Sequence, residues 1–158
     1  MKKKMTILKI LHYPDLRLRN ISNDVNIINN NIRIIIDNMF ETMYHFNGIG
    51  LAANQININK RIIIIDLFKK KNSKLVLINP EIIKIKGIIN SNERCLSIPN
   101  ISGFVQRYKN IKLRAKNYKG KYFELYACNL LSICIQHEMD HLIGKLFIDY
   151  FSKKFLKN

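Results

Sequence analysis

The segment at residues 136–142, Gln-His-Glu-Met-Asp-His-Leu, constrains the fold of this 158-residue chain more than any other. Successive residues of an α-helix are offset by about 100°, so His137 and His141 lie on one face, one turn apart. Leu130 and Cys134 fall on the same face, which is typical of a buried helix. A buried imidazole needs a polar or metal partner. The sequence therefore predicts a buried helix that carries two histidines into a common site.

Within this segment, His137, Glu138 and His141 form the pattern His-Glu-x-x-His. On a helix the pattern places two imidazole ligands around one metal ion, with the glutamate beside them to accept a proton from water. The alternative is a surface helix with two solvated histidines, which would have polar neighbours. Because residues 130–135 are mostly apolar, the pattern favours a metallohydrolase.

A catalytic metal usually has three protein ligands, so one more must come from elsewhere. The side chains open to this role include several carboxylates and five others: Cys95, Cys128, Cys134, His12 and His45. Cys128 and Cys134 belong to the predicted helix or its start, where a thiol usually packs in the core. Cys95 lies in a short segment that ends at Pro99, so its side chain could project into the site from a strand or a loop. Three cysteines without a Cys-x-x-Cys pair favour a reducing compartment over a disulfide framework.

Residues 48–55, Gly-Ile-Gly-Leu-Ala-Ala-Asn-Gln, form a second unusual segment. Two glycines followed by small residues permit close approach by a ligand or another strand. Gly48 could also simply end a preceding helix. Gln55 carries a side-chain amide that is able to donate to a developing oxyanion. The glycine spacing matches neither a dinucleotide loop nor a phosphate loop.

Three segments together resemble the motifs of the peptide deformylase family, in order and separation: residues 48–55, residues 93–97 (Glu-Arg-Cys-Leu-Ser) and residues 136–141. Residues 11–15 and 99–107 also resemble the family, so the similarity covers about residues 5–152. The resemblance implies a hydrolase that removes the formyl group from the N-formylmethionine of nascent chains and releases formate. It also implies one Fe²⁺ as cofactor, with zinc, nickel or cobalt as substitutes.

The resemblance assigns roles to individual residues. Cys95, His137 and His141 match the metal ligands, and Glu138 matches the general acid/base. Gln55 and the backbone N–H of Leu96 match the oxyanion donors. The positions that match substrate-binding residues are Ile49, Gly50, Glu93, Leu130, Ile133 and Cys134. Of these, the last three correspond to the pocket for the methionine side chain.

Some positions depart from the family pattern. Arg94 stands where glycine is usual, and Ser102 stands where many relatives have arginine or another large residue. Arg94 could narrow the substrate groove or point to solvent, and we expect it to be tolerated because the residues that match the catalytic groups are all present. Because of Ser102, we expect weaker contacts beyond the methionine. Bacterial relatives often continue into a longer C-terminal helix that docks on the ribosome, whereas Lys153, Lys154 and Lys157 are all that corresponds to it here. We expect docking through that helix to be reduced.

The net charge of +16 permits non-specific attraction to ribosomal RNA. Isoleucine, asparagine and lysine are abundant throughout, however, and all three have codons rich in A and T. The lysines are scattered in the sequence and lack the interleaved aromatic residues of a single-strand platform. The sequence alone thus favours compositional drift over selection for RNA binding.

The chain has no stretch near 18 apolar residues, so we expect no membrane span. The start, Met1-Lys2-Lys3-Lys4, resembles the charged part of a signal peptide, but Lys9 interrupts the apolar run and no cleavage site follows. We expect a cytoplasmic monomer.

Apolar periodicity predicts a helix capped by Asp24 and extending to Asn47 and Gly48. Strands are expected at 61–67, 75–79 and 81–86, and a hairpin at 110–117 and 121–127 turning at Lys119-Gly120. The motif helix is expected at 129–142, with Gly144 as a stop. A central metal-binding helix against antiparallel or mixed sheet makes an α+β fold, in a single catalytic domain over residues 1–158.

Two rival functions use the same features. A metalloprotease would share the histidines and Glu138 but normally takes its third ligand downstream, where Asp149 is the sole acid. A basic RNA-associated protein with a degenerate site would keep the fold and lose turnover.

Overall fold

A computed structural model describes residues 6–70 and 72–151. The basic residues of 1–5 and the C-terminal Lys153, Lys154 and Lys157, on which the expectations about a signal peptide and ribosome docking rest, lie outside the described residues. In chain order the elements are η1 (Leu16–Arg19), α1 (Asn30–His45), β1 (Gly50–Ala52), η2 (Ala53–Ile56), β2 (Ile62–Ile65), β3 (Leu75–Cys95), β4 (Ile98–Lys116), β5 (Tyr122–Cys128), α2 (Asn129–Leu142) and η3 (Phe147–Tyr150).

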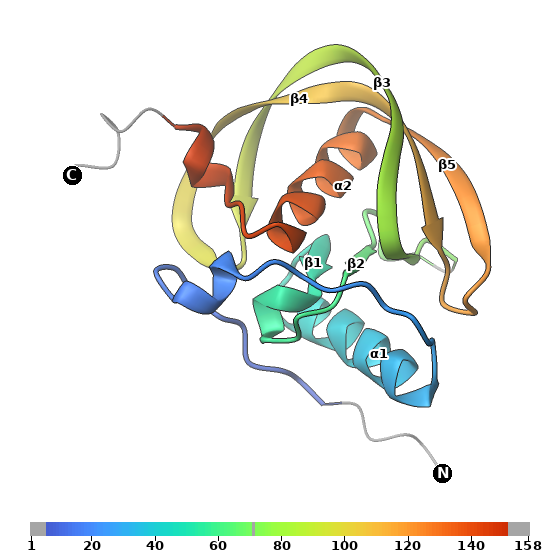
Figure 1. Cartoon of the computed structure of the whole chain (residues 1–158). Coiled ribbons are helices and arrows are strands. Elements are labelled where there is room, and N and C mark those ends of the chain that lie inside the picture. Colours follow the sequence, from blue (N-terminus) through green and yellow to red (C-terminus); the bar gives the residue numbers. More distant parts are fainter. Residues whose placement is uncertain (1–5, 71, 152–158) are drawn as a thin grey trace.

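The strands form one antiparallel sheet in the order β1-β2-β3-β4-β5. Figure 1 shows β3 and β4 arching over α2, with α1 on the other side of β1 and β2. The α+β fold with a central helix is thus the one expected, and none of the strand pairs between named strands is parallel.

The expected strands at 75–79 and 81–86 are parts of one long strand, β3, so the predicted break at Pro80 is wrong. Pro80 has no N–H for a ladder, but the pairing with β4 shifts register between Ile78 and Glu81 and then continues. The sequence also missed the first part of β4, which pairs with the far end of β3 up to Cys95. The hairpin between β4 and β5 turns around Lys119 and Gly120 as predicted.

Four consecutive isoleucines make β2 a fully buried strand with a core on each face. Ile62 and Ile64 pack with α1, in a cluster that includes Ile36, Met39 and Met43. Ile63 and Ile65 pack on the opposite face with residues of α2 and β4. Burying an isoleucine side chain contributes about 1.5–3 kcal/mol, so this strand is a main source of stability.

The predicted cap of α1 is wrong, because the helix begins at Asn30 and Asn29 caps it. The Asn29 side chain accepts a hydrogen bond from the Ile32 N–H at 3.1 Å, whereas Asp24 forms an ion pair with Arg61. At the other end, Asn47 takes the left-handed conformation with φ of 57°. The Gly48 N–H then donates to the Met43 carbonyl, so Gly48 follows the turn and Asn47 makes it.

The motif helix α2 has the predicted bounds, and Gly144 beyond it has φ of +71°. Its apolar side, including Ile135 and Leu142, packs in the core with strand residues. Cys128, just before the helix, is exposed, so the expectation that it packs in the core is wrong; it lies on the outward face of β5. Among the described residues, no helix is both long and apolar enough to cross a membrane.

Candidate metal centre

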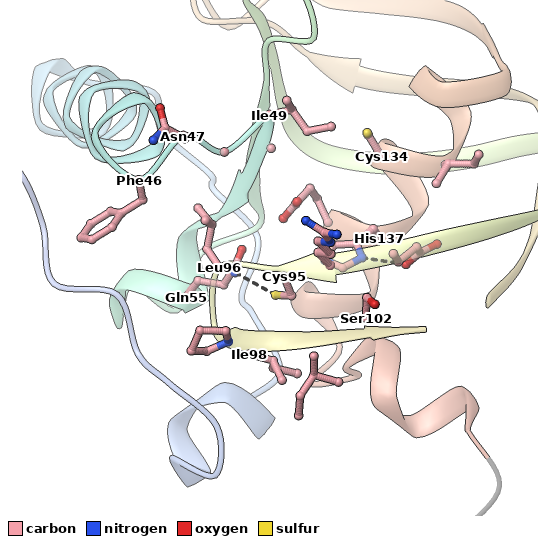
Figure 2. A pocket seen from close by; sticks show the side chains of 18 of the residues that line it. Phe46, Asn47, Ile49, Gln55, Cys95, Leu96, Ile98, Ser102, Cys134 and His137 are labelled. Carbon is pink, nitrogen blue, oxygen red and sulfur yellow. Dashed lines mark hydrogen bonds and ion pairs between the residues drawn. The ribbon is translucent and has the colours of Figure 1, made fainter. Parts of the chain in front are cut away.

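Three side chains from two elements converge at the end of β3. Cys95 is its last residue, and His137 and His141 stand one turn apart on α2. The Cys95 sulfur and one ring nitrogen of each histidine all lie within 4.8 Å of one another, and the three side chains are buried. Figure 2 shows Cys95, Gln55 and His137 turned toward a common space. A thiolate and two imidazoles in such a cluster fit a transition-metal ion.

The other ligands left open by the sequence do not join this cluster. Cys128, His12 and His45 are exposed. Cys134 lines the neighbouring cavity, and burial raises the pKa of its thiol to about 12. A thiol that stays protonated packs as a small apolar group, as expected for that residue.

The two histidines differ in their electrostatic surroundings. Burial lowers the pKa of His141 well below its usual value, so this ring is neutral, the form that binds metals. Burial also acts to lower the pKa of His137, but contacts with Cys95 and Glu93 outweigh it and raise the pKa to about 10. Without an ion, His137 therefore carries the positive charge that compensates the acidic groups around it.

A buried ion pair holds His137 in place. Glu93 accepts hydrogen bonds from Nε and Nη2 of Arg107 at 2.7 and 2.9 Å, and its Oε2 lies 2.8 Å from His137 Nδ1. Arg107 Nη1 also donates to Asp140 at 2.6 Å. Burial acts to raise the pKa of Glu93, but the bonds from Arg107 and His137 hold that pKa below its usual value. Glu93 thus stays ionised and fixes which ring nitrogen of His137 faces Cys95.

Sequence reasoning placed Glu93 among the substrate-binding residues. The residue does line the cavity, but its two carboxylate oxygens bond protein side chains. Arg107 and Asp140 were not recognised as members of the site. No local pattern reveals them, because this ion pair exists only once β3, β4 and α2 meet.

Glu138 lies beside the cluster and is buried. Burial raises the pKa of its carboxyl to about 7, and its Oε2 has no hydrogen-bond partner among the described residues. A group with a pKa near neutrality both accepts and returns protons efficiently. β1 approaches it closely, since a Cβ on Gly50 would lie 2.7 Å from Glu138 Oε1. A side chain at position 50 would therefore displace the Glu138 carboxylate.

Gln55 is held from two sides at the base of the site. Its Oε1 accepts from the Ala52 N–H at 2.9 Å, and its Nε2 donates to Ser97 Oγ at 3.1 Å and lies 3.5 Å from the Cys95 sulfur. Ser97, which the sequence did not single out, thus orients the amide. Leu96 lies between Cys95 and Ser97, in the turn from β3 to β4, and lines the cavity.

A cavity of about 800 Å³ opens beside the cluster. All six predicted substrate-binding residues line it: Ile49, Gly50, Glu93, Leu130, Ile133 and Cys134. Arg94 and Ser102 lie exposed at its rim. Phe46, Asn47 and His12 also line it and were not predicted to do so. The volume and the mostly apolar lining fit a short peptide with an apolar side chain.

Comparison with known proteins gives matches along nearly the whole chain. The family model described as polypeptide deformylase matches residues 7–156. The peptide deformylase of Baumannia cicadellinicola is 59% identical over 148 residues, which cover 94% of this chain and 89% of that protein. The peptide deformylase of Hamiltonella defensa is 53% identical over 148 residues, covering 94% and 86%.

Solved structures match as well. A peptide deformylase from Legionella pneumophila superposes with a TM-score of 0.92 at 40% identity, covering 94% of this chain and 88% of its own. A peptide deformylase from Synechococcus elongatus in complex with actinonin gives a TM-score of 0.89 at 39% identity, covering 98% and 86%.

Proposed function

This chain belongs to the polypeptide deformylase family, and from that membership we propose how its residues carry out the reaction. The enzyme removes the formyl group from N-terminal N-formylmethionine of newly synthesised proteins and releases formate. The observation that carries the assignment of residues is the convergence of Cys95, His137 and His141 in a buried cluster. The proposed catalytic unit is a single domain.

Cys95, His137 and His141 are the proposed ligands of one Fe²⁺, with zinc, nickel or cobalt as substitutes. A soft thiolate with two imidazoles suits these ions better than magnesium or calcium. When bound, such an ion supplies Lewis acidity and lowers the pKa of water from about 15.7 toward 7. Glu93 orients His137 for this role through the bond to Nδ1.

Glu138 is the proposed general acid/base. It accepts a proton from the water that attacks the formyl carbon and returns it to the departing amine as the C–N bond breaks. The products are formate and a free amino terminus. The raised pKa of Glu138, about 7, suits both transfers at neutral pH.

Gln55 and the backbone N–H of Leu96 are the proposed donors to the formyl oxygen as negative charge develops on it. Removing one such donor typically lowers turnover about 100- to 1000-fold. The hydrogen bonds of Gln55 with Ala52 and Ser97 support this role, because they hold the amide before substrate arrives.

Ile49 and Gly50 are proposed to lie along the substrate backbone, and Leu130, Ile133 and Cys134 to form the pocket for the methionine side chain. Their place in the lining of one cavity supports this assignment. Glu93 lines the same cavity, but its bonds to His137 and Arg107 favour a positioning role over direct substrate binding. Further along the peptide, Ser102 at the rim is proposed to make weaker contacts than a larger residue would, and the exposed Arg94 is proposed to be tolerated.

One assay tests the reaction and the ligand set. Anaerobically prepared, Fe²⁺-loaded protein is given a formyl-Met peptide and the same peptide without the formyl group, and formate release is measured. We expect formate from the formylated peptide and no cleavage of peptide bonds in either peptide. A metalloprotease would cleave a peptide bond instead. Protein that binds the metal and releases no formate would overturn the proposal.

Two cysteine variants give the matched control. Cys95→Ala should lose both bound metal and activity, while Cys128→Ser removes an exposed thiol and should keep both. Metal content is measured by mass spectrometry. Air exposure distinguishes an Fe²⁺ form, which should lose activity through oxidation, from a zinc form, which should not.

The enzyme is further proposed to act as a cytoplasmic monomer on nascent formylated chains. Light scattering gives the mass in solution, and a mass twice that of the chain would contradict this part. Docking on a ribosome through a C-terminal helix concerns residues outside those described.

A further inference from the structure

The outward face of β3, β4 and β5 gathers basic side chains around three tyrosines. Residues directly opposite each other in a sheet share a face, and Lys84 pairs with Lys112, Lys112 with Tyr126 and Lys116 with Tyr122. Alternation along β4 adds Tyr108 and Arg114. The charged and aromatic members of this outer sheet face are Glu81, Lys84, Lys86, Tyr108, Lys112, Arg114, Lys116, Tyr122, Glu124 and Tyr126.

The two faces of these strands differ sharply. On the inner face, Ile111, Leu113 and Ala115 alternate with the basic residues of β4 and are buried in the core with α2. On the outer sheet face, Tyr122 and Tyr126 are 69% and 74% exposed. Within residues 6–70 and 72–151, no helix covers these two rings. Large exposed rings on an uncovered sheet face are available to stack against a ligand.

The outer sheet face holds five cations against two carboxylates. Glu124 is shared between Lys112 at 2.5 Å and Arg114 at 3.2 Å. Lys84 and Lys86 form no ion pair with any described residue, and Lys84 lies directly opposite Lys112. Like charges directly opposite each other destabilise a sheet. An anionic ligand over this face would relieve that repulsion.

Cations and rings alternate closely on this face. Lys112 Nζ lies 5.2 Å from the Tyr126 ring centroid, and Lys116 Nζ lies 5.0 Å from that of Tyr122. The two tyrosines are four residues apart on β5, or about 13 Å at the rise of a strand. We propose that the outer sheet face binds single-stranded RNA, with bases stacked on the tyrosines and phosphates paired with the lysines.

The exposed tyrosine rings favour single-stranded RNA as the ligand over other polyanions. Base stacking on exposed aromatic side chains, next to cations that follow the backbone, is how single strands are bound without sequence specificity. A duplex hides its base faces, and an anionic membrane needs the lysines but no ring stacking. Contact with ribosomal RNA would concentrate the enzyme where nascent chains emerge. The proposal does not depend on the assignment of the metal centre.

Sequence reasoning favoured compositional drift because the lysines looked scattered and free of interleaved aromatics. In the folded sheet these residues lie together. Lys84 and Lys86 come from β3, Lys112 and Lys116 from β4, and the rings of Tyr122 and Tyr126 from β5. The alternation of rings and cations runs across the strands, so no stretch of sequence displays it.

Fluorescence anisotropy with a labelled 20-nucleotide oligouridylate tests the proposal over a range of salt concentrations. Lys84→Gln with Lys86→Gln should weaken binding and reduce the salt slope by about two. The matched control, Lys9→Gln with Lys70→Gln, removes the same charge from exposed lysines elsewhere. Tyr122→Leu with Tyr126→Leu should weaken binding about 10-fold or more, and Tyr122→Phe with Tyr126→Phe should restore most of it. Unchanged deformylation shows that each variant is folded.

Each alternative outcome overturns the proposal. Equal weakening by the two lysine pairs would mean that the attraction is diffuse. Tyrosine variants that bind RNA like the wild type would mean that the rings do not stack. If phosphatidylserine vesicles bind as tightly as RNA and duplex RNA binds as tightly as the single strand, the face recognises negative charge alone.

Discussion

Replacing Arg107 by methionine should destabilise the fold strongly, although methionine preserves much of the side-chain volume. The Arg107 and Glu93 side chains are 3% and 4% exposed and share two hydrogen bonds. Without Arg107, Glu93 stays buried with only His137 as a partner. Asp140 and the Tyr150 hydroxyl lose a donor at 2.6 and 3.1 Å as well. The folded protein would still bury the Glu93 carboxylate, but without the charge and hydrogen bonds of Arg107 that offset its desolvation.

The expected loss is about 3–5 kcal/mol of unfolding free energy, the usual cost of breaking a buried pair by removing one partner. A domain of this kind has about 5–15 kcal/mol in total, so the loss is a large fraction of it. With a urea slope near 2 kcal/mol per molar, the unfolding midpoint should fall by about 2 M.

Urea unfolding of the metal-free protein, followed by circular dichroism, measures this loss. Arg114→Met is the matched control, because Arg114 lies on the same strand and pairs with Glu124 but is 53% exposed. We expect that variant to lose less than about 1 kcal/mol. Adding Glu93→Gln to Arg107→Met should recover part of the loss. Equal effects of the two arginine variants would refute the reasoning from burial.

Three other changes have defined outcomes. Gly50→Ala should lower turnover at least about 10-fold while metal content stays constant, because its Cβ would displace Glu138 Oε1; an unchanged kcat would contradict the geometry. In the metal-free protein, burial raises the pKa of Glu138 from 4.5 to about 7. The folded state therefore holds a proton that the unfolded state releases above pH 4.5, and the free energy of unfolding should fall as pH rises from 4.5 through 7. Metal-free Glu138→Gln should therefore be more stable than metal-free wild type above pH 7, by about 3 kcal/mol in urea titrations, and a gap that grows toward low pH would show the opposite sign. Gly144→Ala should cost at least about 1–2 kcal/mol, since φ is +71° and the added Cβ would lie 2.3 Å from the Arg19 carbonyl oxygen; a thermal midpoint like that of the wild type would argue against strain there.

The parts of the fold that the sequence predicted correctly have local signals. The bounds of α2 follow from helical spacing and from Gly144, and the β4–β5 turn follows from Lys119 and Gly120. The predictions were wrong where contacts between distant residues determine which of two nearby residues takes a local role. Asp24 is a good cap by residue type, but it pairs with Arg61, and Asn29 caps α1 instead.

The candidate site divides in the same way. Motifs pointed to Cys95, His137 and His141, and the structure brings the three together. The contacts of Glu93 with Arg107, and of Arg107 with Asp140, depend on the register of a long hairpin against a helix. A linear pattern does not encode that register, which explains why the sequence singled out Cys95, His137 and His141 but not the ion pairs beside them.

The ion pairs that join Glu93, Arg107 and Asp140 have a consequence for the order of assembly. They tie the end of β3 to α2 through protein groups alone, two residues from Cys95 and on the same helix as both histidines. The three ligands are thus held near one another by the polypeptide itself. We therefore expect the chain to complete its fold before it acquires a metal, so that a shortage of the metal would delay activity without delaying folding.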